Sequence, residues 1–137
     1  MEIRKGEARD LAEIAAIQEA SPEAAAWPPR DYLGYDLLVA VRSGRVAGFL
    51  ASRKTAEKEW EILNLAVAPD CRRKGAGRAL VEAFLAEKQG DVFLEVRESN
   101  TTAREFYNSL EFQVVSRRDG YYHHPPEAAI VMKFHSC

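Results

Sequence analysis

The six residues from Arg72 to Gly77 combine positive charge with glycine, directly after an apolar run and directly before a helical pattern. Gly75 and Gly77 let an anion approach the backbone closely. A helix that begins here presents unpaired backbone N–H groups and a partial positive charge. The stretch therefore predicts a site for a phosphate-containing anion, and a pyrophosphate fits it best.

Three phosphate-binding patterns compete for this loop. A Walker loop ends in Gly-Lys-Ser/Thr, whereas Gly77 is followed by Arg-Ala. A Rossmann turn needs a further glycine three residues later, where this chain has Leu80. The pattern Arg-x-x-Gly-x-Gly matches in full at Arg72, Gly75 and Gly77. The alternative without a ligand is a basic helix start with a glycine turn.

Glu95 is a candidate general base because it interrupts an otherwise apolar run from Val92 to Val96. A central parallel strand is usually apolar on both faces. A conflict of this kind marks a functional site more often than an error, and a partly buried carboxylate is a good base near neutral pH. Two alternatives stay open: the side chain points to solvent at the strand end, or it pairs with an arginine.

The elements that must hold these groups follow from residue periodicity. Apolar alternation and short apolar runs predict seven strands, at residues 2–6, 36–42, 45–53, 59–67, 91–97, 111–117 and 127–134. Helical spacing predicts four helices, at residues 8–20, 29–34 and 76–88 and after a capping box at Thr102–Glu105.

The connections between these elements predict the fold class. Ser43-Gly44 predicts a tight hairpin turn and therefore antiparallel strands on either side. The strands at 59–67 and 91–97 are joined through a helix, which Gly90 is expected to close, and should be parallel. Residues 118–126 are expected to form a loop. The result is a mixed α/β sheet with helices on its faces.

Composition and charge narrow the function classes. The 137 residues fit one compact domain, here taken as residues 1–137. The net charge of −2 argues against a protein that coats nucleic acid. No apolar run approaches the ~18 residues that span a bilayer, and the N-terminus lacks the apolar core of a signal peptide. We therefore expect no nucleic-acid or membrane partner.

The cysteines and histidines point to no disulfide framework and no metal site. Cys71 lies in the basic loop and Cys137 is the last residue, an arrangement typical of a reducing, cytoplasmic setting. His123 and His124 are adjacent, and His135 stands alone. None of these has a second cluster at metal-ligand spacing.

The loop resembles the coenzyme A loop of the GNAT superfamily of acetyltransferases, and the wider run is similar to RimI-type (ribosomal-protein-alanine) N-terminal acetyltransferases. The resemblance covers residues 59–122 well and the N-terminal half in outline. It rests on blocks that occur in the family's order, namely Leu63–Val67, the loop itself, Leu94–Asn100, Ala103–Phe112 and the pairs Arg117-Arg118 and Tyr121-Tyr122.

The resemblance implies a GNAT fold, with a central mixed sheet of about seven strands flanked by about four helices. The strands at 59–67 and 91–97 should splay apart, with acetyl-CoA, the acetyl donor, lying between them. Its pantetheine arm should pair with the backbone of residues 65–67 and with Asn100. The expected cofactor-binding residues are Leu65, Ala66, Val67, Arg72, Arg73, Lys74, Gly75, Ala76, Gly77, Arg78 and Asn100.

The resemblance also implies direct acetyl transfer to a primary amine through a tetrahedral intermediate. Glu95 is then the proton acceptor, and Tyr107 is the acid that protonates the leaving thiolate. Glu61, on the preceding strand, is the second candidate for the base. Helical spacing alone favours Tyr107 as a core aromatic residue. A backbone N–H near Leu65 is expected to meet the oxyanion.

The acceptor implied by the likeness is the N-terminal α-amine of a protein, such as a ribosomal protein whose N-terminal residue is alanine. Tyr121 and Tyr122 are expected to line its site. Two other functions stay open: acetylation of a small amine (a polyamine, an aminoglycoside or an amino acid), and acyl-CoA binding without catalysis.

Three positions depart from the family pattern. Glu111 stands where the family has glycine, and a turn that needs a positive φ would be strained there. Asp119-Gly120 adds a residue between the arginine and tyrosine pairs. The acidic pair expected before the last strand is reduced to one acid in Glu127–Ala129. The last two departures lie near the expected acceptor site.

Overall fold

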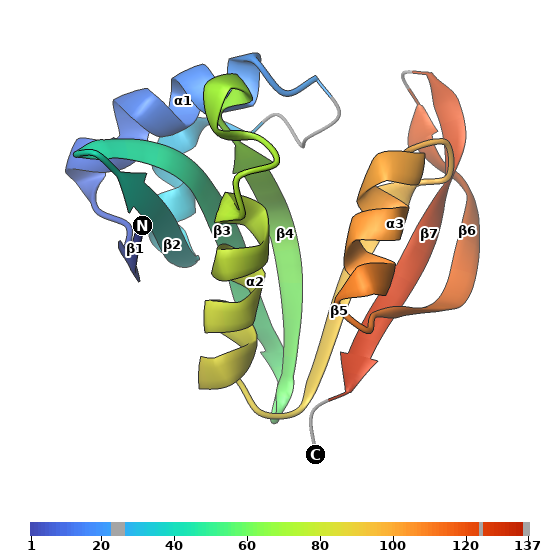
Figure 1. The fold of residues 1–137 in the computed structure, drawn as a ribbon. Coiled ribbons are helices and arrows are strands. Elements are labelled where there is room, and N and C mark those ends of the chain that lie inside the picture. The colour runs from blue at the N-terminus through green and yellow to red at the C-terminus, as the bar shows by residue number, and fades with distance from the viewer. Residues whose placement is uncertain (23–26, 124, 136–137) are drawn as a thin grey trace. The chain divides into compact units, whose positions relative to one another are not determined.

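The computed structural model describes residues 1–22, 27–123 and 125–135. His124 and Cys137, considered above, lie outside these ranges. The strands form one mixed seven-stranded sheet in the order β1-β2-β3-β4-β5-β7-β6 (Figure 1). The chain divides into two compact units: unit 1 is Met1–Arg53 with Ile62–Lys88, and unit 2 is Lys54–Glu61 with Gln89–Cys137. That residues 1–137 act as one domain stays a prediction.

The elements confirm the predicted order along the chain. The strands are β1 (Glu2–Lys5), β2 (Asp36–Arg42), β3 (Arg45–Ala56), β4 (Glu59–Val67), β5 (Asp91–Arg97), β6 (Gln113–His123) and β7 (Pro126–His135). The helices are α1 (Leu11–Glu19), α2 (Ala76–Glu87) and α3 (Thr101–Ser109), with 3-10 turns η1 (Ala8–Asp10), η2 (Pro29–Gly34) and η3 (Pro69–Cys71).

The sheet of unit 1 begins with the antiparallel strands β1, β2 and β3. Ser43 and Gly44 both have positive φ, 52° and 76°, as a two-residue hairpin turn requires. Alternation along β3 separates two layers, because successive side chains point to opposite faces. Phe49 packs with Ile14 of α1 in the buried core on one face. The hairpin prediction is confirmed.

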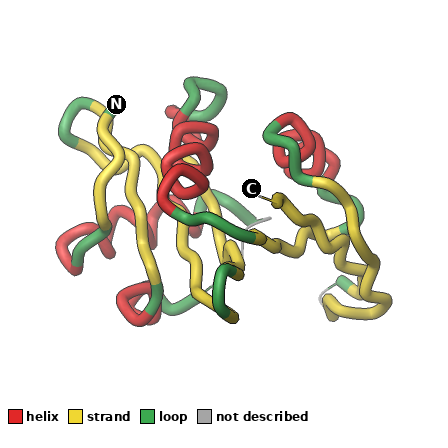
Figure 2. Tube along the Cα trace, turned by 90° about the horizontal axis from the view of Figure 1, so that it is seen from below, coloured by secondary structure: helices red, strands yellow, loops and turns green. Residues whose placement is uncertain are grey.

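The other face of this sheet carries α2 (Figure 2). At Gly48 of β3, an added Cβ would lie 2.9 Å from the carbonyl oxygen of Ala66 and 3.4 Å from Leu80 Cδ1. A side chain there would therefore collide with the backbone of β4 and lie in contact with Leu80 of the helix. The fully buried Leu80 thus packs directly over the glycine, and this contact fixes the start of α2 beside the end of β4.

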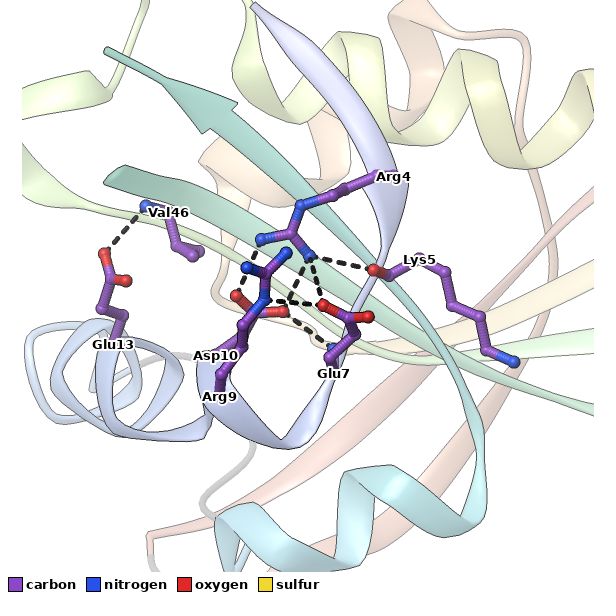
Figure 3. Close-up of polar contacts among 7 residues, drawn as sticks. All are labelled: Arg4, Lys5, Glu7, Arg9, Asp10, Glu13 and Val46. Atoms are coloured by element: carbon purple, nitrogen blue, oxygen red, sulfur yellow. Dashed lines mark hydrogen bonds and ion pairs between the residues drawn. The ribbon is translucent and has the colours of Figure 1, made fainter. Parts of the chain in front are cut away.

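An ion pair between Asp10 and Arg4 holds together the segment that joins β1 to α1 (Figure 3). Asp10 is only 3% exposed. It accepts two bonds of 2.9 Å from the Arg4 guanidinium and one of 2.8 Å from the Glu7 backbone N–H. Glu13 of α1 accepts a bond of 2.8 Å from the Val46 N–H of β3. These bonds orient α1 on its sheet.

Unit 2 is built on the antiparallel strands β5, β7 and β6. The start of β4 joins them in the predicted parallel direction, with Glu59–Glu61 opposite Asp91–Phe93. That β4 and β5 splay further along stays a prediction.

Gly90 does not close α2 as expected, because the helix already ends at Glu87. A Cβ added at Gly90 would lie 2.7 Å from the Lys58 carbonyl carbon and closer still to its oxygen. Real Cβ atoms do not approach backbone atoms this closely. The glycine therefore lets β5 begin against the β3–β4 turn, and its assignment to the helix end was wrong.

The loop expected at residues 118–126 is instead part of a hairpin. β6 continues to His123, and its pairing with β7 resumes at Tyr122 opposite Glu127 after an irregular stretch from Arg118. Gly120 lies in that stretch with φ of 63°. The glycine absorbs the extra residue as a local bulge, so the prediction of a loop was wrong.

Candidate active site

The predicted anion loop lies in unit 1 between the end of β4 and the start of α2. Arg73 and Gly75 both have positive φ, 62° and 88°. Gly75 is the N-cap of α2, and a Cβ added there meets no atom within 4 Å. The need for glycine at this point is therefore conformational, and the backbone at the helix start has open space beside it.

Arg72 is bound within the chain. Its Nε donates to the Val67 carbonyl over 3.2 Å, and its Nη2 donates to the Ala20 carbonyl over 3.0 Å and to Ser21 Oγ over 3.1 Å. These bonds tie the loop to the end of β4 and the end of α1. The first residue of the Arg-x-x-Gly-x-Gly pattern therefore shapes the loop.

Positive charge gathers around the start of α2. Arg73, Lys74 and Arg78 are exposed, and the first turn of α2 contains no acidic residue. Arg78 also lies 3.9 Å from Glu82 one turn along the helix. Because the first N–H groups of a helix lack intrahelical partners, those of Ala76 and its neighbours add to the attraction for an anion.

The expected strand for the pantetheine arm is the end of β4. Leu65 and Val67 are half-buried, and Ala66 between them is buried. The chain leaves the strand at Ala68, whose N–H donates to the Ala47 carbonyl of β3 over 2.7 Å. The residues of β4 therefore pass directly into the loop.

Glu95, the candidate base, lies on β5 in unit 2 with 17% of its side chain exposed. Its Oε1 accepts a bond of 2.7 Å from Arg118 Nη1 of β6. Its Oε2 is buried and has no hydrogen-bond partner among the described residues. The pairing with an arginine, left open by the sequence, is thus present, and one carboxylate oxygen stays available.

Two tyrosines of β6 complete the surroundings of Glu95. The Tyr121 ring lies 4.3 Å from the Arg118 guanidinium carbon and 5.0 Å from the Tyr122 ring. Burial and then the negative charge of Glu95 raise the pKa of Tyr121, and Glu61 of β4 contributes in the same direction. Tyr121, Arg118 and both candidate bases therefore share one electrostatic environment.

Tyr107, the candidate acid, lies on α3 with 6% exposure. Its ring packs edge-on against Phe106 at 5.1 Å and Phe112 at 5.4 Å. Burial raises the pKa of this phenol, which keeps it protonated at neutral pH and makes it a weaker acid than a free tyrosine. The interpretation of Tyr107 as a core aromatic residue is confirmed, and its role as the acid stays a prediction.

The candidate base and acid lie on opposite faces of the strands of unit 2. Phe112 packs on Phe134 of β7, whose register partner on β5 is Val92. Side chains alternate along β5, so Glu95 faces the other way. Glu95 and Tyr107 are therefore separated by the sheet layer of unit 2, and their joint role in one acetyl transfer stays a prediction.

Asn100 caps α3. Its Oδ1 accepts a bond of 3.1 Å from the Ala103 N–H, so the cap is Asn100 and the capping box expected at Thr102 was misplaced by two residues. That Asn100 also contacts the pantetheine arm stays a prediction. The structure gives the same side chain a local role at the helix start.

Sequence reasoning missed the specific partner of Glu95, because that pairing crosses β7 and depends on the register of three strands. Within the described ranges, no three His, Cys, Asp or Glu side chains gather where they could hold a metal ion. No helix in the same ranges is long and apolar enough to cross a membrane.

The family model of the acetyltransferase (GNAT) family matches residues 7–112, which include the loop, β5 and α3. The chain belongs to the GNAT family. This GNAT protein is 38% identical over 95 residues to the ribosomal protein bS18-alanine N-acetyltransferase of Escherichia coli K12, which covers 66% of this chain. The aligned stretch spans only 62% of the E. coli protein.

Further comparisons agree with this family. The N-alpha-acetyltransferase RimI of Mycobacterium tuberculosis is 33% identical over 106 residues, 70% of this chain and 67% of that protein. The crystal structure of the E. coli ribosomal-protein-S18-alanine N-acetyltransferase superposes with a TM-score of 0.83 at 30% identity, over 97% of this chain and 92% of that one. Ard1 from Thermoplasma volcanium gives 0.90 at 27% identity, over 99% and 97%. The GNAT fold implied by the sequence is confirmed.

Proposed function

We propose that this GNAT protein transfers the acetyl group of acetyl-CoA to a primary amine, and that the acceptor is the N-terminal α-amine of a protein. One observation carries the proposal: two residues with positive φ turn the chain so that exposed cationic side chains surround the start of α2. A GNAT protein with such a loop has a binding site for a pyrophosphate.

The loop fits the anionic part of acetyl-CoA. Arg73, Lys74 and Arg78 supply charge, and the first N–H groups of α2, from Ala76 and Gly77, supply donors. Arg72 contributes by holding the loop to β4 and α1. The backbone of residues 65–67 and the side chain of Asn100 are proposed to hold the pantetheine arm.

Acetyl-CoA supplies an activated acetyl group, and the chain supplies two proton transfers. Glu95 takes a proton from the acceptor ammonium on its buried Oε2. An α-amine has a pKa near ~8, so a mild base is sufficient. Tyr107 gives its proton to the leaving thiolate from the opposite face of the strands. Glu61 is the alternative base.

Several observations support a protein N-terminus as the acceptor. The two relatives named above are an N-acetyltransferase for the alanine of a ribosomal protein and an N-alpha-acetyltransferase. Tyr121 and Tyr122 lie beside Glu95, where an acceptor backbone would pass. Glu127, the acid left from the reduced pair, accepts from the Ser99 N–H over 2.5 Å and pairs with Arg97 at 3.3 Å, so it is used within the chain. A ribosomal acceptor would place the reaction in the cytoplasm.

The test is thiol release from acetyl-CoA with a panel of acceptors. The panel contains a peptide that begins with alanine, the same peptide with a blocked N-terminus, a polyamine and an aminoglycoside, with mass spectrometry to locate the acetyl group. We expect acetylation of the free peptide at its α-amine only. Turnover only with the polyamine or the aminoglycoside would show that the acceptor is a small amine. Binding of acetyl-CoA without turnover on any amine would show that the protein is a non-catalytic acyl-CoA-binding module.

A pair of variants tests the base. Glu95→Gln should lower kcat about 100-fold or more, because general base catalysis contributes ~10² to 10⁴ in rate. Glu61→Gln is the matched control on the neighbouring strand and should keep most of the activity. The opposite pattern would assign the proton transfer to Glu61.

A further inference from the structure

Arg118 reaches Glu95 across an intervening strand. Arg118 of β6 lies opposite Ala129 of β7, and Glu95 of β5 lies opposite Val131 of β7, so both side chains project from the same face. Two strand spacings, about 10 Å, separate β5 from β6. The residue between them, Ala129, is fully buried and has no side chain beyond Cβ. The guanidinium can therefore cross β7 and donate to Glu95 over 2.7 Å.

The guanidinium is held on its other side as well. Its carbon lies 4.3 Å from the centre of the Tyr121 ring, a distance typical of a cation–π contact. The planar fork of Arg118 thus lies between an aromatic ring and a carboxylate. This arrangement fixes the orientation of the carboxylate more firmly than a single flexible ion pair would.

The two oxygens of Glu95 are consequently unequal. Oε1 is occupied by Arg118, whereas Oε2 is buried and has no partner among the described residues. A buried acceptor without a partner is costly, and a catalytic role is one of the few explanations for such an atom in a native structure. The geometry therefore singles out Oε2 as the atom that meets an incoming donor.

We propose that Arg118 is a positioning residue for acetyl transfer, which holds Oε1 of Glu95 so that Oε2 receives the proton of the acceptor ammonium. In this step an N–H bond of the ammonium breaks and an O–H bond forms at Oε2. The freed amine electron pair forms a bond to the acetyl carbon while the C=O π pair moves to oxygen. The C–S bond then breaks as this oxyanion collapses, and coenzyme A leaves as a thiolate that takes up a proton. Arg118 keeps its protons throughout. The proposal rests on the proposed function and on Glu95 as its base.

The neighbouring residue supplies a matched control. Arg117 points to the other face of β6 and pairs with both oxygens of Glu98, at 2.8 Å and 3.1 Å. It has the same charge, lies on the same strand and is similarly exposed, at 50% against 54% for Arg118. A change at either arginine removes one strand charge. Arg118 loses its ion pair with Glu95, whereas Arg117 loses ion pairs with Glu98 and Asp119 and does not contact Glu95.

The experiment is a double-mutant cycle read by steady-state acetyl transfer to the alanine peptide. Arg118→Gln should lower kcat about 10- to 100-fold, the loss expected when a reacting group is displaced by about 1 Å. KM for acetyl-CoA should stay within about twofold, and Arg118→Lys should recover part of the rate. In a Glu95→Gln background, Arg118→Gln should cause no further loss. Arg117→Gln should be close to neutral in both backgrounds.

Two results would overturn the proposal: wild-type kcat in Arg118→Gln, or the same loss from Arg118→Gln with and without Glu95. A circular dichroism melt of each variant establishes folding, and Arg118→Lys keeps the test valid if the glutamine variant does not fold. Failure of the proposed function looks different, because the wild-type protein itself would then acetylate no amine in the panel.

Discussion

Replacing Glu111 by glycine should stabilise the protein, because Glu111 occupies the left-handed position that ends α3. Its φ is 72°. The Glu111 N–H donates to the Asn108 carbonyl and the Phe112 N–H to the Tyr107 carbonyl, each over 3.0 Å. These two bonds and the ring contact between Tyr107 and Phe112 make a Schellman motif, whose left-handed residue is usually glycine. The family-based prediction of a positive φ at Glu111 is confirmed.

The size of the gain follows from two opposing effects. A residue with a Cβ in the left-handed region costs about 1–2 kcal/mol relative to glycine. Glycine loses more backbone entropy on folding, which takes back about 0.5–1 kcal/mol. The net gain in the free energy of unfolding should be about 0.5–1 kcal/mol, equivalent to about 2–4 °C in Tm for a chain of this size.

The assay is urea denaturation of Glu111→Gly beside two controls. Glu111→Ala removes the same charge but keeps a Cβ, so it should bring no comparable gain. Glu105→Gly makes the same exchange at an exposed position inside α3, where glycine should cost about 1 kcal/mol. If Glu111→Gly is no more stable than Glu111→Ala, the strain argument is refuted.

Three further predictions concern the frame and the chemistry. Gly90→Ala should destabilise the protein by more than about 2 kcal/mol in urea denaturation, because its Cβ would overlap the Lys58 carbonyl group; wild-type stability would contradict the contact. Asp10→Asn should cost about 1–3 kcal/mol at pH 7. Hydrogen bonding from Arg4 lowers the pKa of Asp10 in the folded protein. The difference in stability between wild type and Asp10→Asn should therefore be complete above the pKa of an unfolded Asp, near ~3.9, and should vanish as the pH falls through the folded pKa. A stability difference that does not depend on pH would contradict the ion pair. Tyr107→Phe should keep the fold and lower kcat about 10- to 100-fold, and unchanged turnover would leave Tyr107 as a core residue only.

Periodicity in the sequence was sufficient for most of the fold. The strands and helices, the hairpin at Ser43-Gly44 and the parallel start of β4 and β5 all follow from local patterns. Local chemistry misled at three points. Gly90 was assigned to a helix end although it relieves a contact with Lys58, Asp119-Gly120 suggested a loop although it forms a bulge, and Thr102 was preferred to Asn100 as the cap.

The sequence could predict only those parts of the site whose roles depend on residues close together in the chain. The loop before α2 follows from charge and glycine spacing, because helix starts attract anions wherever they occur. The Arg118–Glu95 pair depends on which residue of β6 lies opposite Ala129, and a shift of one residue would turn Arg118 to the other face. Likewise, no sequence pattern indicates that Arg72 binds the end of α1. Roles that depend on strand register or on distant backbone carbonyls need the structure.

The most direct test of the account is a calorimetric titration of coenzyme A into the wild-type protein and into a variant with Arg73, Lys74 and Arg78 all changed to glutamine. We expect coenzyme A to bind the wild-type protein and to bind the triple variant at least about tenfold more weakly at low salt, since charges at a helix start each contribute modestly. The Lys54→Gln variant, which loses an exposed positive charge outside the loop, should bind coenzyme A as the wild type does. Absence of heat with the wild-type protein, or equal affinity in the triple variant, would contradict a pyrophosphate site at the start of α2.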